Sequence, residues 1–285
     1  MSRVPALRGL DENRCLVMGI VNRTPDSFYD PGRMSLEGAV RHALDLVEEG
    51  ADVLDLGGVK AGPGTPVSEE EETRRLLPLV EELSKKAAVP LSVETARGAV
   101  AARALDAGAS IVNDVTGLSD PAMSGVCAEK GASLVLLHHG GQIRGRPLNP
   151  RYEDVVAEVC QFFDELAARA ERDGVPPENI IVDPGLDFGK TTFHSLELMR
   201  RLDEIVARGR PVLVAPSRKD VVGEMLDVGV EERLEGTLAL VALAVAAGAA
   251  LVRVHDVRAG ARTVAMVEGV VGRRQPEAPV RGLWE

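Results

Sequence analysis

The sequence is short of cysteine, and the few that it has are placed in a way that excludes most structural uses of the residue. Cys15, Cys127 and Cys160 are odd in number, far apart, and each set in an apolar segment. Disulfide frameworks and zinc clusters need pairs or short regular spacings, and neither pattern occurs here. We therefore expect three reduced thiols in a cytoplasmic protein.

Long apolar runs and an excess of positive charge are missing as well. The apolar stretch 237–252 contains Gly248 and is shorter than the roughly 20 residues that span a bilayer. Residues 1–11 hold no apolar core of the kind found in signal peptides. The formal net charge is -11, which argues against nucleic acid or an anionic membrane as a partner. With 45% hydrophobic residues, the chain can still build a sizeable core.

Short apolar runs without polar alternation recur eight times, as expected for parallel strands covered on both faces. They lie at 15–21, 53–56, 91–93, 110–112, 133–137, 180–182, 211–215 and 250–254. Helical patterns separate them at 36–49, 69–87, 97–107, 121–130, 152–173, 193–207, 234–247 and 259–272.

Eight strand–helix units predict an α/β protein with one domain, a (β/α)8 TIM barrel over residues 15–272. An extension at 1–14 precedes this domain, and a proline- and charge-rich tail at 273–285 follows it. A doubly wound open sheet is the alternative. It would need a reversal in strand order, and it gives no reason for eight units.

Chemistry in such a barrel is expected where the strands end, because the βα loops meet at that face. Polar residues follow nearly every predicted strand: Asn22, Glu94, Asn113, His138, His139, Asp183, Lys219, Arg253 and His255. Arg253 and His255 lie two apart on the last strand and so share a side, which suits a phosphate. The alternative is a buried arginine bound to a carboxylate, with His255 capping the next helix. The two adjacent histidines have no third zinc ligand at a suitable spacing, so we interpret them as structural or pocket-lining.

Four motifs, in order, resemble the signatures of the dihydropteroate synthases and cover the chain from about residue 15 to about residue 271. They are MGIVNRTPDSF at 18–28, IVDPG followed by FGK within 181–190, SRK at 217–219 and RVHDV at 253–257. The family usually has valine where Arg23 stands. The resemblance implies a barrel that condenses 6-hydroxymethyl-7,8-dihydropterin pyrophosphate with p-aminobenzoate and releases pyrophosphate.

The same resemblance implies roles for individual residues around the anion. Asn22 is expected to help hold Mg²⁺ and the pyrophosphate, and Arg253 and His255 to bind the pyrophosphate. Negative charge builds up on the departing oxygens, which these groups and the metal would stabilise. Lys219, Arg253 and His255 are therefore the candidate catalytic residues.

The pterin pocket implied by the resemblance consists of Glu94, Asn113, Asp183, Lys219 and Arg253. Glu94 stands where the family usually has aspartate. A fixed carboxylate such as Asp183 can accept both N–H groups on one pterin edge, and Arg253 can lie flat on the ring. Simpler roles are open for three of them. Asp183 could cap a turn, Asn113 could tie two loops together, and Lys219 could be a surface charge.

The departures from the family pattern gather on the side of the second substrate. Ala61 and Gly62 replace the threonine and arginine of a mobile loop that closes over p-aminobenzoate. Asp220 replaces a serine that, with the start of the next helix, receives the benzoate carboxylate. The simpler reading of Asp220 is a helix cap. Asp187 replaces a glycine and adds a negative charge directly before Phe188.

Two functions therefore compete. The chain can be a synthase that makes 7,8-dihydropteroate, or a pterin-binding paralogue that uses another nucleophile or acts as a binding or regulatory protein. Its segments at 59–64 and 219–224 resemble a divergent actinobacterial branch whose members are suspected of little or no synthase activity. A methyltetrahydrofolate-dependent methyltransferase and a Schiff-base aldolase are weaker alternatives. The apolar helix 237–247 permits a homodimer through the late barrel helices, as the family suggests, although a covered barrel helix would look similar.

Overall fold

Eight short strands, all parallel, form one sheet whose two edge strands meet. The computed structural model describes residues 14–23, 35–59, 66–141, 149–276, 278–279 and 281. The strand order is β6-β5-β4-β3-β2-β1-β8-β7, and a parallel bridge between Val182 and Val212 joins the two ends. The strands are β1 Leu16–Asn22, β2 Val53–Gly57, β3 Leu91–Glu94, β4 Ile111–Asp114, β5 Ser133–Leu137, β6 Ile180–Asp183, β7 Leu213–Val214 and β8 Leu251–Val254.

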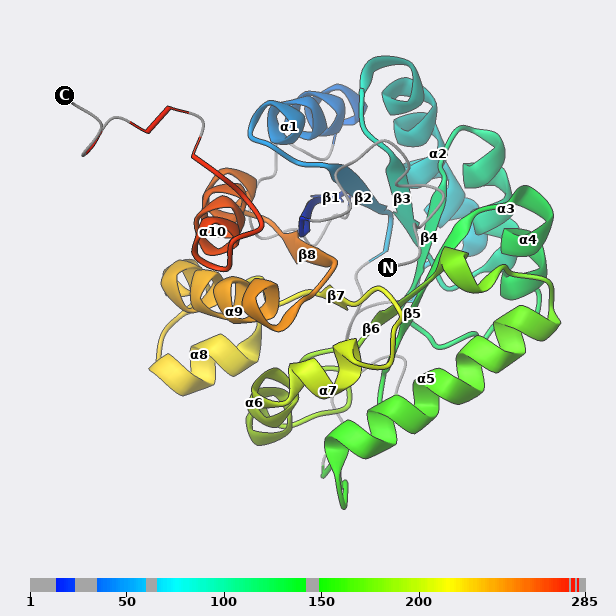
Figure 1. Cartoon of the computed structure of the whole chain (residues 1–285). Helices are drawn as coiled ribbons and strands as arrows, with labels where there is room; N and C mark the ends of the chain where they lie inside the picture. The colour runs from blue at the N-terminus through cyan, green and yellow to red at the C-terminus, as the bar shows by residue number, and fades with distance from the viewer. Residues whose placement is uncertain are drawn as a thin grey trace.

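Helices surround these strands (Figure 1), so the predicted single-domain TIM barrel is confirmed. They are α1 Leu36–Glu48, α2 Glu69–Lys86, α3 Gly98–Asp106, α4 Met123–Lys130, α5 Val155–Arg172, α6 Thr192–Arg200, α7 Leu202–Val206, α8 Asp220–Leu226, α9 Leu234–Ala247 and α10 Val257–Val270. Two helices, α8 and α9, follow β7. The sequence analysis predicted α9, at 234–247, but gave no range for α8.

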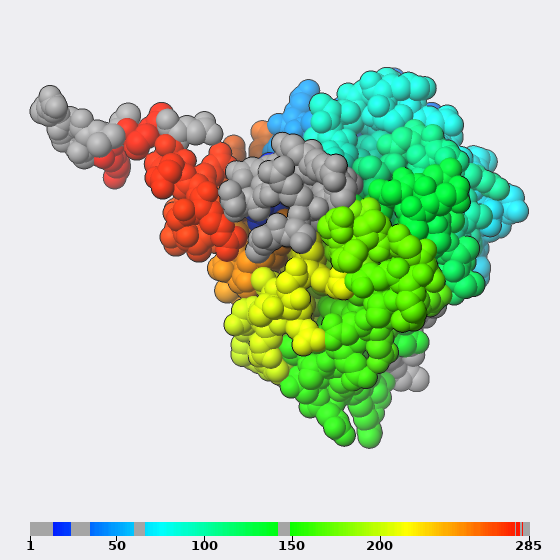
Figure 2. Space-filling view, turned by 45° about the vertical axis from the view of Figure 1, so that its right-hand side comes forward, coloured from blue at the N-terminus to red at the C-terminus, as the bar shows by residue number. Residues whose placement is uncertain are grey.

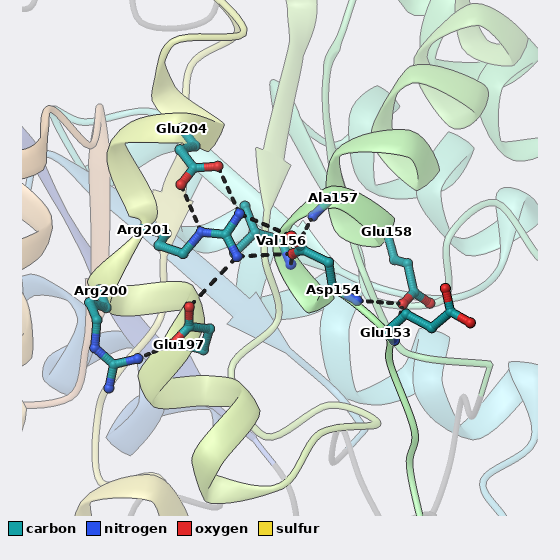
Figure 3. A network of polar contacts seen from close by, with 9 residues as sticks. All are labelled: Glu153, Asp154, Val156, Ala157, Glu158, Glu197, Arg200, Arg201 and Glu204. Atoms are coloured by element: carbon teal, nitrogen blue, oxygen red, sulfur yellow. Dashed lines mark hydrogen bonds and ion pairs between the residues drawn. The ribbon is translucent and has the colours of Figure 1, made fainter.

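The helix predicted over 193–207 is wrong in one respect, because it is broken at Arg201 into α6 and α7. The guanidinium at the break donates to Asp154 at 3.0 and 3.1 Å and to Glu204 at 2.7 and 2.9 Å (Figure 3). Asp154 is also the N-cap of α5 and accepts from Val156 and Ala157. The break thus places one arginine where it links the start of α5 to the α6–α7 pair.

The barrel interior contains an apolar layer with a polar layer above it, toward the C-terminal ends of the strands. The apolar layer is formed by Leu16, Met18, Val53, Ile111, Val135, Ile181, Leu213 and Leu251. Two residues further along four of these strands stand Asp55, Asn113, Asp183 and Arg253. Alternate residues of a strand point to the same face, so these polar side chains also face the barrel axis. The other strand face packs against the helices and forms the larger apolar core.

The remaining predictions about the ends and the surface can be placed only in part. The extension at 1–14 lies outside the described residues apart from Arg14. The described residues of the tail after α10 are exposed and lead away from the barrel (Figures 1 and 2). All three cysteines are free, as predicted. Among the described residues, no helix is long and apolar enough to cross a membrane.

Candidate functional site

Arg253 lies between two buried carboxylates at the centre of the barrel mouth. Its Nε donates to Asp55 Oδ2 and its Nη2 to Glu94 Oε2, both at 2.6 Å. Asp55 also accepts from Ser92 Oγ at 2.6 Å and from Asn113 Nδ2 at 3.0 Å. The buried arginine paired with carboxylates, given above as the alternative, is therefore present. Nη1 has no hydrogen bond within the described part of the chain, so one edge of the guanidinium can still take a ligand.

Asp55 is the functional side chain that the sequence analysis missed. It is fully buried and binds three other polar side chains of the site. Its signal was a single aspartate inside the apolar strand 53–57, because a buried carboxylate needs partners.

The single positive charge of Arg253 cannot balance the negative charges of both Asp55 and Glu94. The excess negative charge affects the pKa of Glu94. Burial raises the pKa of Glu94 to about 7, with Arg253 opposing the rise and Asp55 adding to it. Burial by itself lowers the pKa of Arg253, but attraction to Asp55 and Glu94 outweighs this and the pKa is raised. The group therefore keeps a charged arginine and a glutamate that exchanges its proton near neutral pH.

Asn113 and Asp183 each have an acceptor that the described residues leave unpartnered or only partly used. Asn113 is 2% exposed, and its Oδ1 has no hydrogen-bond partner among the described residues. Asp183 Oδ1 accepts from the N–H of Gly185 at 2.7 Å, so the turn-capping role considered for it is present too. Burial raises the pKa of Asp183, while the charges of Lys219 and Arg253 and the Gly185 N–H oppose the rise. Buried acceptors without partners are rare in proteins, and they mark places where a ligand can donate.

Lys219 lies in the mouth and not on the outer surface. Its Nζ donates to Leu186 O at 2.5 Å and lies 4.8 Å from the centroid of the Phe188 ring. Burial lowers the pKa of Lys219, and the negative charges of Asp183 and Asp187 oppose this. The surface-charge interpretation of Lys219 is therefore wrong.

The SRK and RVHDV motifs bind each other. Ser217 Oγ lies 2.9 Å from His255 Nδ1 and also accepts from the backbone N–H of His255 at 3.1 Å. Arg218 pairs with Asp256 through two hydrogen bonds of 2.9 and 3.0 Å. His255 does not cap α10, whose N-cap is Asp256 and has no side-chain cap bond. Desolvation and the positive charges of Arg253 and Arg218 lower the pKa of His255, so its ring is neutral at pH 7.

Asn22 ends β1 and is exposed. A Cβ on the neighbouring Gly57 would lie 2.7 Å from Asn22 Oδ1, so a larger residue there would displace the Asn22 side chain. Among the described residues, no group of three His, Cys, Asp or Glu side chains could hold a metal ion. An exposed amide oxygen still suits Mg²⁺, which keeps several waters and often takes one or two protein ligands together with substrate phosphates.

The second-substrate side can be placed only in part, because Ala61 and Gly62 lie outside the described residues. Asp220 is the first residue of α8, but it does not cap that helix. The cap is Asp187, whose Oδ2 accepts from the N–H of Asp220 at 2.6 Å and of Val221 at 3.3 Å. The helix-cap interpretation of Asp220 is therefore corrected.

Lys190 anchors the loop that carries Asp187 and Phe188. Its Nζ lies 2.7 Å from His138 Nδ1 and donates to the carbonyl oxygens of His138, Gly185 and Phe188 at 3.1, 3.0 and 2.9 Å. Burial and the charge of Lys190 lower the pKa of His138 to about 3, so His138 is a neutral acceptor. The structural interpretation of His138 fits these contacts.

Comparison with known proteins agrees with this geometry. The profile of the family described as pterin binding enzyme matches residues 18–255. The chain belongs to the pterin binding enzyme family. It is 49% identical to a Mycobacterium leprae protein named inactive dihydropteroate synthase 2, over 97% of each chain. It is 41% identical to the dihydropteroate synthase of Bacillus subtilis, over 92% of this chain and 90% of the relative.

Solved structures of the same family superpose on the barrel. The Yersinia pestis dihydropteroate synthase, solved as a sulfonamide drug complex, matches with a TM-score of 0.89 and 36% identity, covering 93% of this chain and 98% of the other. The Xanthomonas albilineans dihydropteroate synthase with 4-aminobenzoic acid matches with a TM-score of 0.85 and 42% identity, covering 90% and 93%. The chain is therefore a homologue of the dihydropteroate synthases, as the motifs indicated.

The raised pKa of Glu94 predicts a pH effect on stability. Because that pKa lies near 7 in the folded protein and near 4.5 unfolded, the folded state binds the extra proton, and stability falls as pH rises through this window. Urea unfolding of the parent and of Glu94→Gln between pH 4 and 8 checks this. We expect the parent to lose stability relative to the variant across the window. Glu81→Gln on the exposed face of α2 should give a constant difference, and a constant difference for Glu94→Gln would contradict the prediction.

Proposed function

We propose that the barrel mouth binds 6-hydroxymethyl-7,8-dihydropterin pyrophosphate and that p-aminobenzoate is a poor second substrate or none. The observation that carries the proposal is the unpartnered buried acceptor of Asn113, which lies at the same end of the barrel as the buried carboxylate of Asp183 and the ammonium of Lys219. Such a set calls for a flat ligand with donors on one edge and acceptors on the other.

A pterin ring has that distribution of donors and acceptors. Its amino group and adjacent ring N–H can both donate to Asp183, which has only the Gly185 N–H as a donor among the described residues. Asn113 Oδ1 accepts a further N–H, and Lys219 donates its remaining hydrogens to the ring carbonyl or a ring nitrogen. The Arg253 guanidinium, held by Asp55 and Glu94, supplies a flat cationic surface.

The pyrophosphate is assigned to the rim formed by Asn22, Arg253 and His255. Nη1 of Arg253 is open to an anion, and the neutral His255 ring donates from Nε2 when Nδ1 accepts from Ser217. Asn22 Oδ1 can serve as a protein ligand of Mg²⁺. When bound, the metal would neutralise charge on the phosphate oxygens.

The synthase reaction needs little acid–base chemistry from the chain. The nitrogen lone pair of the amine forms a bond to the exocyclic pterin carbon while the carbon–oxygen bond breaks. The electron pair leaves with pyrophosphate, and the amine loses one proton to solvent. Arg253 and His255 stabilise the departing charge, and Lys219 and Asp183 hold the ring in position.

The second substrate is where this chain departs from a working synthase. Asp220 and Asp187 both place carboxylates near the start of α8, where the family resemblance puts the benzoate carboxylate. The inactive name of the Mycobacterium leprae relative supports weak or absent turnover of p-aminobenzoate. The second candidate function is an ordinary synthase, which the named synthases of Bacillus subtilis and Escherichia coli favour.

The first test of the proposal is titration with the pterin pyrophosphate in the presence of Mg²⁺, followed by a p-aminobenzoate turnover assay. Asp183→Asn keeps an oxygen for the Gly185 N–H but removes the charge, so the affinity should fall at least about tenfold, or 1.4 kcal/mol. Asp203→Asn on the exposed face of α7 should bind as the parent does. Equal affinity of all three proteins would show that the pterin does not bind at Asp183. Turnover of p-aminobenzoate at about 0.1 to 10 per second would show that the protein is an ordinary synthase.

A second test separates the anion from the ring. The Nδ1 edge of His255 is packed against Ser217, but the residue as a whole is exposed, so His255→Ala should fold normally while losing one donor to the pyrophosphate. We expect its affinity for the pyrophosphate ester to fall about fivefold or more, and its affinity for plain 6-hydroxymethyl-7,8-dihydropterin to stay within about twofold of the parent. Calorimetry with the two ligands measures the difference. Equal losses for both would remove His255 from the anion site.

A homodimer in the cytoplasm is part of the proposal. Phe193 of α6, Met225 of α8 and Leu243 of α9 are 83%, 64% and 57% exposed, and these helices adjoin in the barrel (Figure 1). Exposed apolar side chains on neighbouring helices are typical of subunit interfaces.

Sedimentation equilibrium should therefore give twice the chain mass for the parent, and Leu243→Glu should give a monomer. Met266→Glu, at a side chain of α10 that is 68% exposed, should leave the mass unchanged. A monomeric parent at micromolar concentration would refute the dimer.

A further inference from the structure

Asp187 holds a left-handed backbone conformation, which few residues other than glycine, asparagine and aspartate adopt. Its φ is +67°, in the left-handed region where a Cβ crowds the backbone. Only four residues other than glycine have a positive φ in the described part of the chain: Leu118, Asp187, Arg218 and Asp227. A residue keeps such a conformation when the surrounding contacts fix it more strongly than the strain opposes it.

The contacts that fix Asp187 join three elements. Its Oδ2 accepts from the first two N–H groups of α8, and its Oδ1 accepts from Ser195 Oγ of α6 at 3.3 Å. Its own N–H donates back to Ser195 Oγ at 3.1 Å. The carboxylate is thus bound at both oxygens and cannot turn away without losing its three hydrogen bonds.

This fixed carboxylate adds a negative charge at the start of α8. Asp183 and Asp187 both act on the Lys219 ammonium, and Lys190, which anchors the same loop, also lies near these two carboxylates. The two N–H groups that begin α8 are already used by Asp187. Lys219 itself is bound to the carbonyl of Leu186, the residue before Asp187. Asp220 pairs with Arg233 at 3.0 Å, so that guanidinium is also engaged. A carboxylate ligand beside the start of α8 would meet the Asp187 carboxylate and two backbone N–H groups that this carboxylate already occupies.

We infer that Asp187 is a specificity-determining residue, and that the ligand bound beside the pterin is an uncharged amine and not a carboxylate. The inference rests on the proposed function, because it concerns the ligand that would sit next to the pterin. It adds the chemical class of that ligand and the residue that selects it.

The chain provides a matched pair of substitutions for the test. Asparagine is among the residues that best tolerate a left-handed backbone, and its amide oxygen can still accept from the α8 N–H groups, so Asp187→Asn removes the charge and little else. Asp227 has a φ of +54° at the other end of the same helix and is exposed. Asp227→Asn is therefore the same change in the same conformation, away from the mouth. Asp187→Gly relieves the strain and removes both the cap and the charge.

The experiment uses the full chain saturated with 6-hydroxymethyl-7,8-dihydropterin, Mg²⁺ and inorganic pyrophosphate, so that no turnover occurs. Calorimetric titration then compares p-aminobenzoate with p-aminobenzamide, which differ in charge but hardly in shape. The parent and Asp227→Asn should bind the amide at least about tenfold more tightly, which corresponds to about 1.4 kcal/mol. Asp187→Asn and Asp187→Gly should reduce this preference about fivefold or more by gaining affinity for the carboxylate.

The outcomes separate the two proposals. Failure of the pterin to bind in the first step would reject the proposed function, and the inference with it. If the parent binds the pterin normally but binds p-aminobenzoate and p-aminobenzamide with equal affinity, only the inference is overturned. The inference would also be overturned if the parent bound neither p-aminobenzoate nor p-aminobenzamide. The same holds if the preference for the amide in both Asp187 variants stayed within about twofold of the preference in the parent.

Discussion

The pairing of Arg253 with Asp55 and Glu94 is the interaction on which the site depends. Two carboxylates buried in the barrel are tolerated because a guanidinium lies between them, and removal of the arginine would leave charges that neither water nor protein compensates. The pairing links β8 to β2 and β3, and through Asp55 it also orients Asn113. A single buried ionic group thus fixes the polar layer above the apolar layer.

The two sides of the mouth differ in how their charges are used. Around Arg253, one N–H edge and the Asn113 oxygen remain open to a ligand within the described structure. Around α8 the first two N–H groups are taken by Asp187, and Nη1 of Arg233 is paired with Asp220. The barrel is thus that of a dihydropteroate synthase homologue, while the start of α8 carries carboxylates that already bind its own donors. Family membership fixes the fold and leaves the activity to such local charges.

Several features escaped sequence reasoning for identifiable reasons. Asp55 sits in an apolar strand, and only the register of β2 against its neighbours shows that it faces the axis beside Arg253. Asp187 precedes α8 by more than 30 residues, so nothing local marks it as the cap of that helix. The apolar pattern over 193–207 is continuous and predicts one helix. The break at Arg201, where the guanidinium contacts Asp154, cannot be seen in that pattern.

The sequence by itself determined the barrel, the order of its strands and helices, and the strand ends at which chemistry can occur. These features follow from local patterns: apolar runs and helix-ending glycines that recur along the chain, and motifs at particular strand ends. Such patterns can be recognised without knowing which distant residues are in contact. Only the tertiary structure decided which charges meet across the barrel: Arg253 with Asp55 and Glu94, and Asp187 with the start of α8. Charges interact through space over a few ångströms, and the closure of the barrel brings together Arg253 and Asp55, which the chain separates by 198 positions.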